Sequence, residues 1–141
     1  MRASVLRATF PITVLVLLMA TSARADDSRQ YYTAAQSKAG ASVYASQCSV
    51  CHGSELQGKT GPALAGQDFR DSISYSKMSG KQLYQFISSQ MPYDSPGSLT
   101  EQEYQQIVAY ILEENGFPAG KQALTTATLD QVSLLPFPKT K

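Results

Sequence analysis

Two stretches of the chain place apolar residues at the three- and four-residue spacing that is typical of an amphipathic helix. The clearer one predicts a helix that begins after Thr100, with Glu103 completing a capping box, and ends at Asn115. Its apolar face consists of Tyr104, Ile107, Val108, Ile111 and Leu112. Residues 81–90 predict a helix of about three turns. Residues 36–47 predict a third helix, supported by several alanines.

The pattern is much weaker between and after these helices. Residues 53–79 show no clear period and are interrupted by glycines, so we expect a loop with at most a short turn of helix. Such a long loop is unusual in a compact domain, and three helices offer little apolar surface for a core. A large, flat, apolar cofactor at the centre would resolve both conflicts. Residues 117–141 form a tail that we expect to dock on the domain, because it contains Leu129, Val132, Leu134, Leu135 and Phe137.

The first 25 residues have the three parts of a secretory signal peptide. A positively charged start precedes the apolar run 8–20, and a small-x-small cleavage sequence occupies residues 23–25. An uncleaved anchor is the alternative, but this run is too short to cross about 30 Å of hydrocarbon comfortably. We therefore expect a periplasmic protein with residues 1–25 removed, residues 26–35 as a flexible lead-in and no membrane span after cleavage.

Composition limits the classes of function. The chain has 141 residues, enough for one domain, and a net charge of +1. Cleavage would remove Arg2, Arg7 and Arg24 and no acidic residue, which changes the net charge to −2. That balance offers no electrostatic case for binding nucleic acid. Two cysteines and one histidine exclude a zinc site of four cysteines, or of two cysteines and two histidines, within one chain.

The run Cys48-Ser49-Val50-Cys51-His52 has the spacing for covalent attachment of a c-type haem. Two thiols at this spacing can add to the two neighbouring vinyl groups of a porphyrin, and the next residue places an imidazole beneath the iron. A thioredoxin-like redox pair is an alternative, but it would need a βαβ pattern that is not visible. A structural disulfide would leave His52 without a role. We therefore expect one covalently bound haem c, with Cys48 and Cys51 as its attachment points and His52 as an iron ligand.

At this point the sequence resembles a class I cytochrome c over residues 36–116. Gly40, Tyr44 and Cys48 fall at four-residue steps, as in the first helix of that family, and Tyr110 lies in a stretch like its last helix. The resemblance implies an all-α, small cytochrome c fold, with three main helices and loops wrapped around one covalent haem. It also implies that the first and last helices cross, with Gly40 allowing their close approach.

The sequence Gly61-Pro62 looks like the family's loop whose proline carbonyl accepts the N–H of the haem-binding histidine. The resemblance therefore implies that Pro62 orients His52. A simple turn is the alternative role for this dipeptide.

Two methionines remain after signal cleavage as candidates for the sixth iron ligand, Met78 and Met91. Met78 precedes the helix at 81–90, where an apolar residue can simply pack on the helix start. Met91 opens a loop restrained by Pro92 and Pro96, which lowers the entropy lost in holding a side chain at the iron. The resemblance also places the ligand in such a loop. We expect Met91 to bind iron, with Met78 as the alternative.

The segments at 91–99 and 115–120 look like those of cytochromes that accompany bacterial quinoprotein alcohol dehydrogenases. This implies an electron carrier rather than an enzyme. We expect it to pass single electrons from a dehydrogenase to a respiratory acceptor, with a quinoprotein as the dehydrogenase and a terminal oxidase as the acceptor. One alternative is a haem peroxidase or ligand-binding sensor with an open sixth position, which the lack of a second histidine disfavours. Another is a fixed cytochrome subunit of a dehydrogenase complex.

Overall fold

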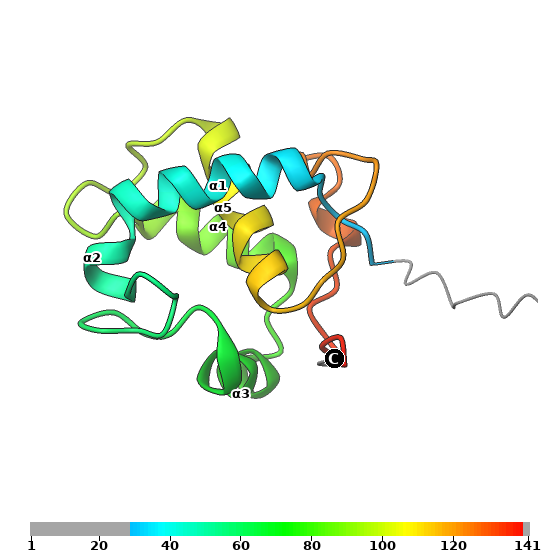
Figure 1. Cartoon of the computed structure of the whole chain (residues 1–141), viewed down its shortest axis with the longest axis horizontal. Helices are drawn as coiled ribbons and strands as arrows, with labels where there is room; N and C mark the ends of the chain where they lie inside the picture. The colour runs from blue at the N-terminus through cyan, green and yellow to red at the C-terminus, as the bar shows by residue number, and fades with distance from the viewer. Residues whose placement is uncertain (1–28, 140–141) are drawn as a thin grey trace, which may run out of the picture.

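The computed structural model describes residues 29–139, and the expected signal peptide at 1–25 lies outside the described residues. The described part is helical and contains no strand, which confirms the expected all-α fold (Figure 1). Its elements are α1 (Ala34–Gln47), α2 (Ser49–His52), α3 (Gly66–Ser76), α4 (Gly80–Gln90), α5 (Glu101–Glu114) and the 3-10 turn η1 (Leu129–Gln131). Between residues 29 and 139, no helix is both long enough and apolar enough to cross a membrane.

Three helices begin at capping boxes, which explains why the sequence locates them well. Thr33, Ser79 and Thr100 each accept a hydrogen bond from the backbone N–H three residues later. The glutamine or glutamate side chain at that later position accepts a hydrogen bond from the N–H of the cap residue. These exchanged bonds satisfy backbone N–H groups that a helix start otherwise leaves unpaired. The predicted helices therefore agree with α1, α4 and α5 to within two residues at their starts.

The expectation of an irregular loop over residues 53–79 is wrong for its second half, where α3 forms. This helix has no side chain capping its start, and its apolar side is only Phe69 and Ile73, four residues apart. Both are buried in the same core as α5. The apolar core is therefore larger than the sequence indicated, because α3 and the tail after α5 also contribute side chains to it.

The first and last long helices cross closely, as the resemblance implied. Helices α1 and α5 share the most extensive contact between any two elements of the described chain. A Cβ atom added to Gly40 would lie only 1.9 Å from the carbonyl oxygen of Gln106, so only glycine allows this approach. One turn further along α1, the ring centroids of Tyr44 and Tyr110 are 5.4 Å apart in a tilted arrangement.

The lead-in before α1 was expected to be flexible, and its described part is instead packed against the tail. Tyr32 is buried, and its hydroxyl donates to the carbonyl oxygen of Phe117 at 2.6 Å. The N–H of Gly120 donates to the carbonyl oxygen of Tyr32 at 2.7 Å. The lead-in and the tail therefore hold each other in place at the end of the molecule remote from α2 (Figure 1).

The tail also contacts the start of α4. The N–H of Gly80 donates to the carbonyl oxygen of Val132 at 3.0 Å, and Lys81 forms an ion pair with Asp130 at 2.8 Å. A Cβ atom on Gly80 would lie 2.2 Å from the Val132 side chain, so this contact is nearly as close as the α1–α5 crossing. Asp130 of η1 and Val132 directly after it thus fix the beginning of α4.

Candidate functional site

The two cysteines and the histidine lie on a single turn of helix. Cys48 is the residue between α1 and α2, and its carbonyl oxygen accepts hydrogen bonds from the N–H groups of Cys51 at 3.1 Å and His52 at 2.9 Å. Neither cysteine is in a disulfide, and Cys48 is half-buried whereas Cys51 is exposed. The α2 turn therefore presents two thiols and one imidazole at the end of α1 (Figure 1).

The imidazole of His52 is held in one orientation. The ring is buried, and its Nδ1 lies 2.7 Å from the carbonyl oxygen of Pro62. A carbonyl can only accept, so Nδ1 carries a proton and donates, and in the neutral ring Nε2 is then the nitrogen with a lone pair. A neutral imidazole with one nitrogen fixed in this way is the form that binds a metal.

The loop after α2 packs directly against this ring. A Cβ atom on Gly61 would lie 2.8 Å from Cε1 of His52 and 3.0 Å from its Nδ1, so a larger residue would displace the imidazole. The N–H of Gly61 donates to the carbonyl oxygen of Cys51 at 2.9 Å, and the N–H of Gly58 donates to that of His52 at 2.7 Å. These bonds fold the loop back onto the turn that contains the cysteines and the histidine.

A tyrosine of α1 holds the start of the same loop. The hydroxyl of Tyr44 donates to the carbonyl oxygen of Gly53 at 2.6 Å. Burial, with smaller contributions from Cys48 and Tyr110, raises the pKa of Tyr44 to about 12, so its hydroxyl stays protonated at neutral pH. The sequence placed Tyr44 only at a four-residue step in the first helix, and this spacing gave no sign that it donates to the loop.

The thiol of Cys48 does not have the lowered pKa of a catalytic redox cysteine. Burial, and secondly the neighbouring Cys51, raise the pKa of Cys48 to about 11, whereas catalytic redox cysteines have lowered pKa values. Within residues 29–139, no three or more histidine, cysteine or acidic side chains gather into a metal-binding cluster. Two unpaired thiols beside an oriented neutral imidazole are the donor set that a covalent haem requires, and these residues therefore fit haem c.

The two candidate methionines lie at opposite ends of α4, and both are half-buried against the core. Met78 precedes the N-cap of α4, near the contact with Val132, and Met91 is the residue at which α4 ends. The eleven residues of α4 separate them by about 16 Å of helix. In Figure 1 the loop that follows α4 extends to the side of the molecule on which α2 lies, whereas η1 lies on the other side.

Met91 has a firmly held backbone. Its N–H donates to the carbonyl oxygen of Ile87 at 3.0 Å, which continues the helical pattern of α4. Its own carbonyl oxygen accepts from the hydroxyl of Tyr104 at 2.7 Å and from the N–H of Gly97 at 3.3 Å. The first turn of α5 and the far end of the loop thus fix the Met91 backbone between them.

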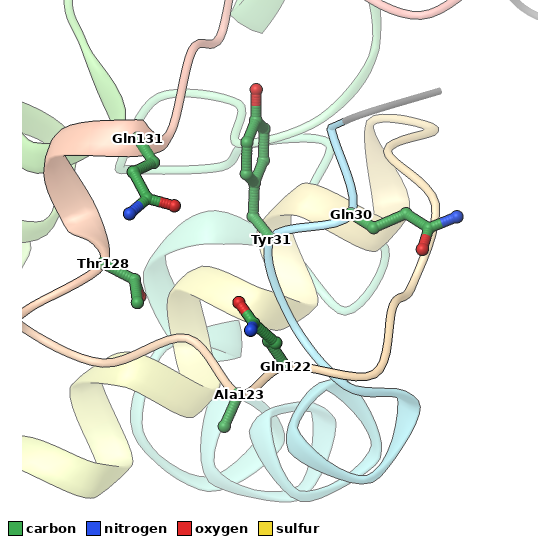
Figure 2. Close-up of a pocket in the computed structure, with 6 residues that line it drawn as sticks. All are labelled: Gln30, Tyr31, Gln122, Ala123, Thr128 and Gln131. Carbon is green, nitrogen blue, oxygen red and sulfur yellow. The ribbon is translucent and has the colours of Figure 1, made fainter. Parts of the chain in front are cut away.

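A cavity of about 290 Å³ lies elsewhere, between the lead-in and the tail. Figure 2 shows Gln122, Thr128 and Gln131 facing this space beside the ring of Tyr31, while Gln30 points away from Gln131. Its lining contains neutral amides and the two hydroxyl-bearing residues Tyr31 and Thr128, but no histidine, cysteine or acidic residue. This cavity is therefore unsuited to binding an iron centre, and the chemistry is concentrated at α2.

Two comparisons relate the chain to known proteins. Residues 35–111 match the family described as cytochrome c oxidase, cbb3-type, subunit III. A chain of the sulfane dehydrogenase SoxCD from Paracoccus pantotrophus is similar in structure, with a TM-score of 0.56 and 27% sequence identity. That similarity covers 70% of this chain and 53% of the other, so this protein spans about half the length of the chain it matches. No curated protein sequence matches the chain.

The family match covers more than half of the chain and includes Cys48, Cys51, His52 and Pro62. It agrees with the all-helical fold and with the crossing of α1 and α5. The protein is a class I c-type cytochrome and belongs to the cytochrome c oxidase, cbb3-type, subunit III family of monohaem cytochrome domains.

Proposed function

We propose that this protein is a periplasmic monohaem electron carrier, not an enzyme, which passes single electrons between a dehydrogenase and a respiratory acceptor. Haem electron transfer follows from the family. Beyond the family, we propose that the protein is exported, which side chains bind its iron, and with which classes of protein it exchanges electrons. The observation on which it rests is the 2.7 Å contact between Nδ1 of His52 and the carbonyl oxygen of Pro62.

The residues of the site would act as follows. Cys48 and Cys51 would hold the haem by two thioether bonds, and Nε2 of His52 would be one ligand of its iron. The carbonyl of Pro62 would accept the hydrogen bond from Nδ1–H, which would fix the ring and make Nε2 more basic. The thioether of Met91 would be a second ligand, and a His/Met pair would raise the reduction potential. The haem would supply a one-electron couple between ferrous and ferric iron. With a histidine and a methionine both bound, substrate would have no open coordination position.

The neighbouring structure supports a more specific arrangement, in which the protein is a fixed subunit of a dehydrogenase. SoxCD is a dehydrogenase, and one of its chains shares this fold over 70% of the present protein. A fixed subunit would use the same residues and differ only in having a permanent partner. Purification of the untagged native protein under mild conditions separates the two cases, since a subunit co-elutes with a larger chain in constant ratio. A quinoprotein is the dehydrogenase class that we propose, with a terminal oxidase as acceptor.

The attachment of haem is tested by mass spectrometry of the exported protein. We expect a mass that corresponds to residues 26–141 plus one haem, because both thiols are free to react and residues 1–25 have the form of a signal peptide. A denaturing gel stained for haem should show that the group stays attached. Free thiols at Cys48 and Cys51 in the exported protein would contradict the proposal.

The sixth ligand is tested by a pair of variants, Met91→Ala and Met78→Ala. Met91→Ala should remove the weak red sulfur-to-iron absorption of the ferric protein, lower the reduction potential and allow ferrous iron to bind carbon monoxide. These effects follow because the thioether favours ferrous iron and blocks its sixth position. Met78→Ala serves as the matched control, being equally half-buried and at the other end of α4.

Each outcome of this pair has a definite meaning. If Met78→Ala removed the red absorption and Met91→Ala did not, Met78 would be the ligand. If neither variant had an effect, neither methionine would be the sixth ligand, and the peroxidase or sensor interpretation would be reopened.

A further inference from the structure

The side chain of Asn115 is an unusual polar group in the core of this protein. It lies at the end of α5, where its exposed fraction is 0%. Its Nδ2 donates to the carbonyl oxygen of Leu64 at 2.9 Å and to that of Ile111 at 2.8 Å. Its Oδ1 is buried without a hydrogen-bond partner. An unpaired buried acceptor is unfavourable, so any benefit of asparagine here comes from the two bonds that Nδ2 donates.

One of these bonds reaches the loop that holds His52. Leu64 lies two residues after Pro62, and its N–H donates to the carbonyl oxygen of Leu56 at 2.8 Å. On the other side of Pro62, the N–H of Gly61 is bound to Cys51. Pro62 itself has no N–H to donate. The position of its carbonyl therefore depends on these anchors before and after it, and Asn115 connects the second anchor to α5.

The backbone at Asn115 is fixed independently of its side chain. Its N–H donates to the carbonyl oxygens of Ile111 and Leu112 at 3.2 Å each. Its own carbonyl oxygen accepts from Nη2 of Arg70 at 3.2 Å. Its backbone angles, φ −96° and ψ 11°, suit other residues as well. A substitution here can remove the side-chain bonds while leaving the end of α5 in place.

We propose that Asn115 is a positioning residue for the haem-binding histidine, acting through Leu64 and Pro62. This inference rests on the proposed role of His52 as an iron ligand. By holding Leu64, Asn115 keeps the Pro62 carbonyl close to Nδ1 of His52. A close carbonyl strengthens the hydrogen bond that Nδ1–H donates, which gives the imidazole more electron density and favours ferric iron. Without the hydrogen bond from Asn115 to Leu64, the Pro62 carbonyl moves away from His52 more often. This favours ferrous iron and exposes the Nδ1 proton to solvent.

The test compares Asn115→Leu with a control of similar kind, Tyr32→Phe. Leucine has nearly the shape of asparagine but cannot donate. Tyr32→Phe also removes one buried bond from a side chain to a backbone carbonyl, at the end of the molecule remote from α2. Asn115→Ser is a second variant, smaller than the native residue, in case leucine prevents folding. The haem-loaded proteins are measured by redox titration, and exchange of the His52 Nδ1 proton is followed by NMR in the ferrous state.

Both Asn115 variants should have a higher reduction potential than the native protein. The Nδ1 proton should exchange about two- to tenfold faster, the range that corresponds to the loss of one net hydrogen bond. Tyr32→Phe should lower the melting temperature without changing the potential or this exchange rate. If the Asn115 variants lost stability but matched Tyr32→Phe in potential and exchange, Asn115 would be structural only and the inference would be wrong. A native protein without a low-spin haem spectrum would instead overturn the proposed function, and this inference with it.

Discussion

The His52→Ala variant is expected to lose the low-spin haem spectrum and much of its stability. The chain contains one histidine, so no other imidazole can replace this ligand. The ring is buried between the α2 turn and Gly61, so its removal also leaves a gap where the loop packs. Loss of a metal bond together with a buried side chain should cost more than about 3 kcal/mol. In a domain of this size, that lowers the melting temperature by more than about 12 °C.

Absorption spectroscopy and thermal unfolding check this expectation, with Ser54→Ala as the control. Ser54 is exposed, lies two residues from His52 and has no hydrogen-bond partner among the described residues. Added imidazole should partly restore the low-spin spectrum of His52→Ala, since the Pro62 carbonyl is still available to accept its N–H. A six-coordinate low-spin spectrum in the variant without added imidazole would show that His52 is not the ligand.

The second large effect is expected at the crossing of α1 and α5, from Gly40→Leu. Even a Cβ atom at this position would lie 1.9 Å from the carbonyl oxygen of Gln106 and 3.0 Å from Cβ of Tyr110. The helices must therefore separate, at a cost of about 1–3 kcal/mol or more for overpacking. The melting temperature should fall by at least about 4 °C, and the Tyr44 contact with Tyr110 should weaken.

Ala45→Leu places the same leucine side chain on the exposed side of α1 and should change the melting temperature little. Calorimetry of both haem-loaded variants gives the comparison. An unchanged melting temperature in Gly40→Leu would mean that α1 and α5 do not meet at this glycine in solution.

The elements that sequence reasoning located well are those with local signals. Thr100 and Glu103 form a capping box that can be read within four residues, and α5 begins where they predict. In contrast, α3 has no side-chain cap and only two buried apolar residues, so its helical state depends on packing from elsewhere. The ordered lead-in was missed for the same reason, because the partners of Tyr32 are Phe117 and Gly120, far along the chain.

A similar division applies to the candidate site. Cys48, Cys51 and His52 form a contiguous motif, and the resemblance implied the contact of His52 with Pro62, which is only ten positions away. The sequence predicted that a helix ends at Asn115, and α5 does end there. No nearby residue indicated that the Asn115 side chain donates to Leu64. That contact joins residues 51 positions apart and can be found only in three dimensions.

The pairing of α1 with α5 also determines when the chain can fold. Tyr32 and Phe117 are 85 residues apart, and Ser37 donates to Glu113 across 76 residues. Closing loops of this length has to precede the gain from the largest helix contact, which slows folding compared with a bundle of sequential neighbours. A growing or translocating chain therefore presents its two cysteines and its histidine well before the partner of its first helix has emerged. Premature termination near residue 100 would yield a chain that retains every haem-attachment residue and lacks the helix that stabilises them.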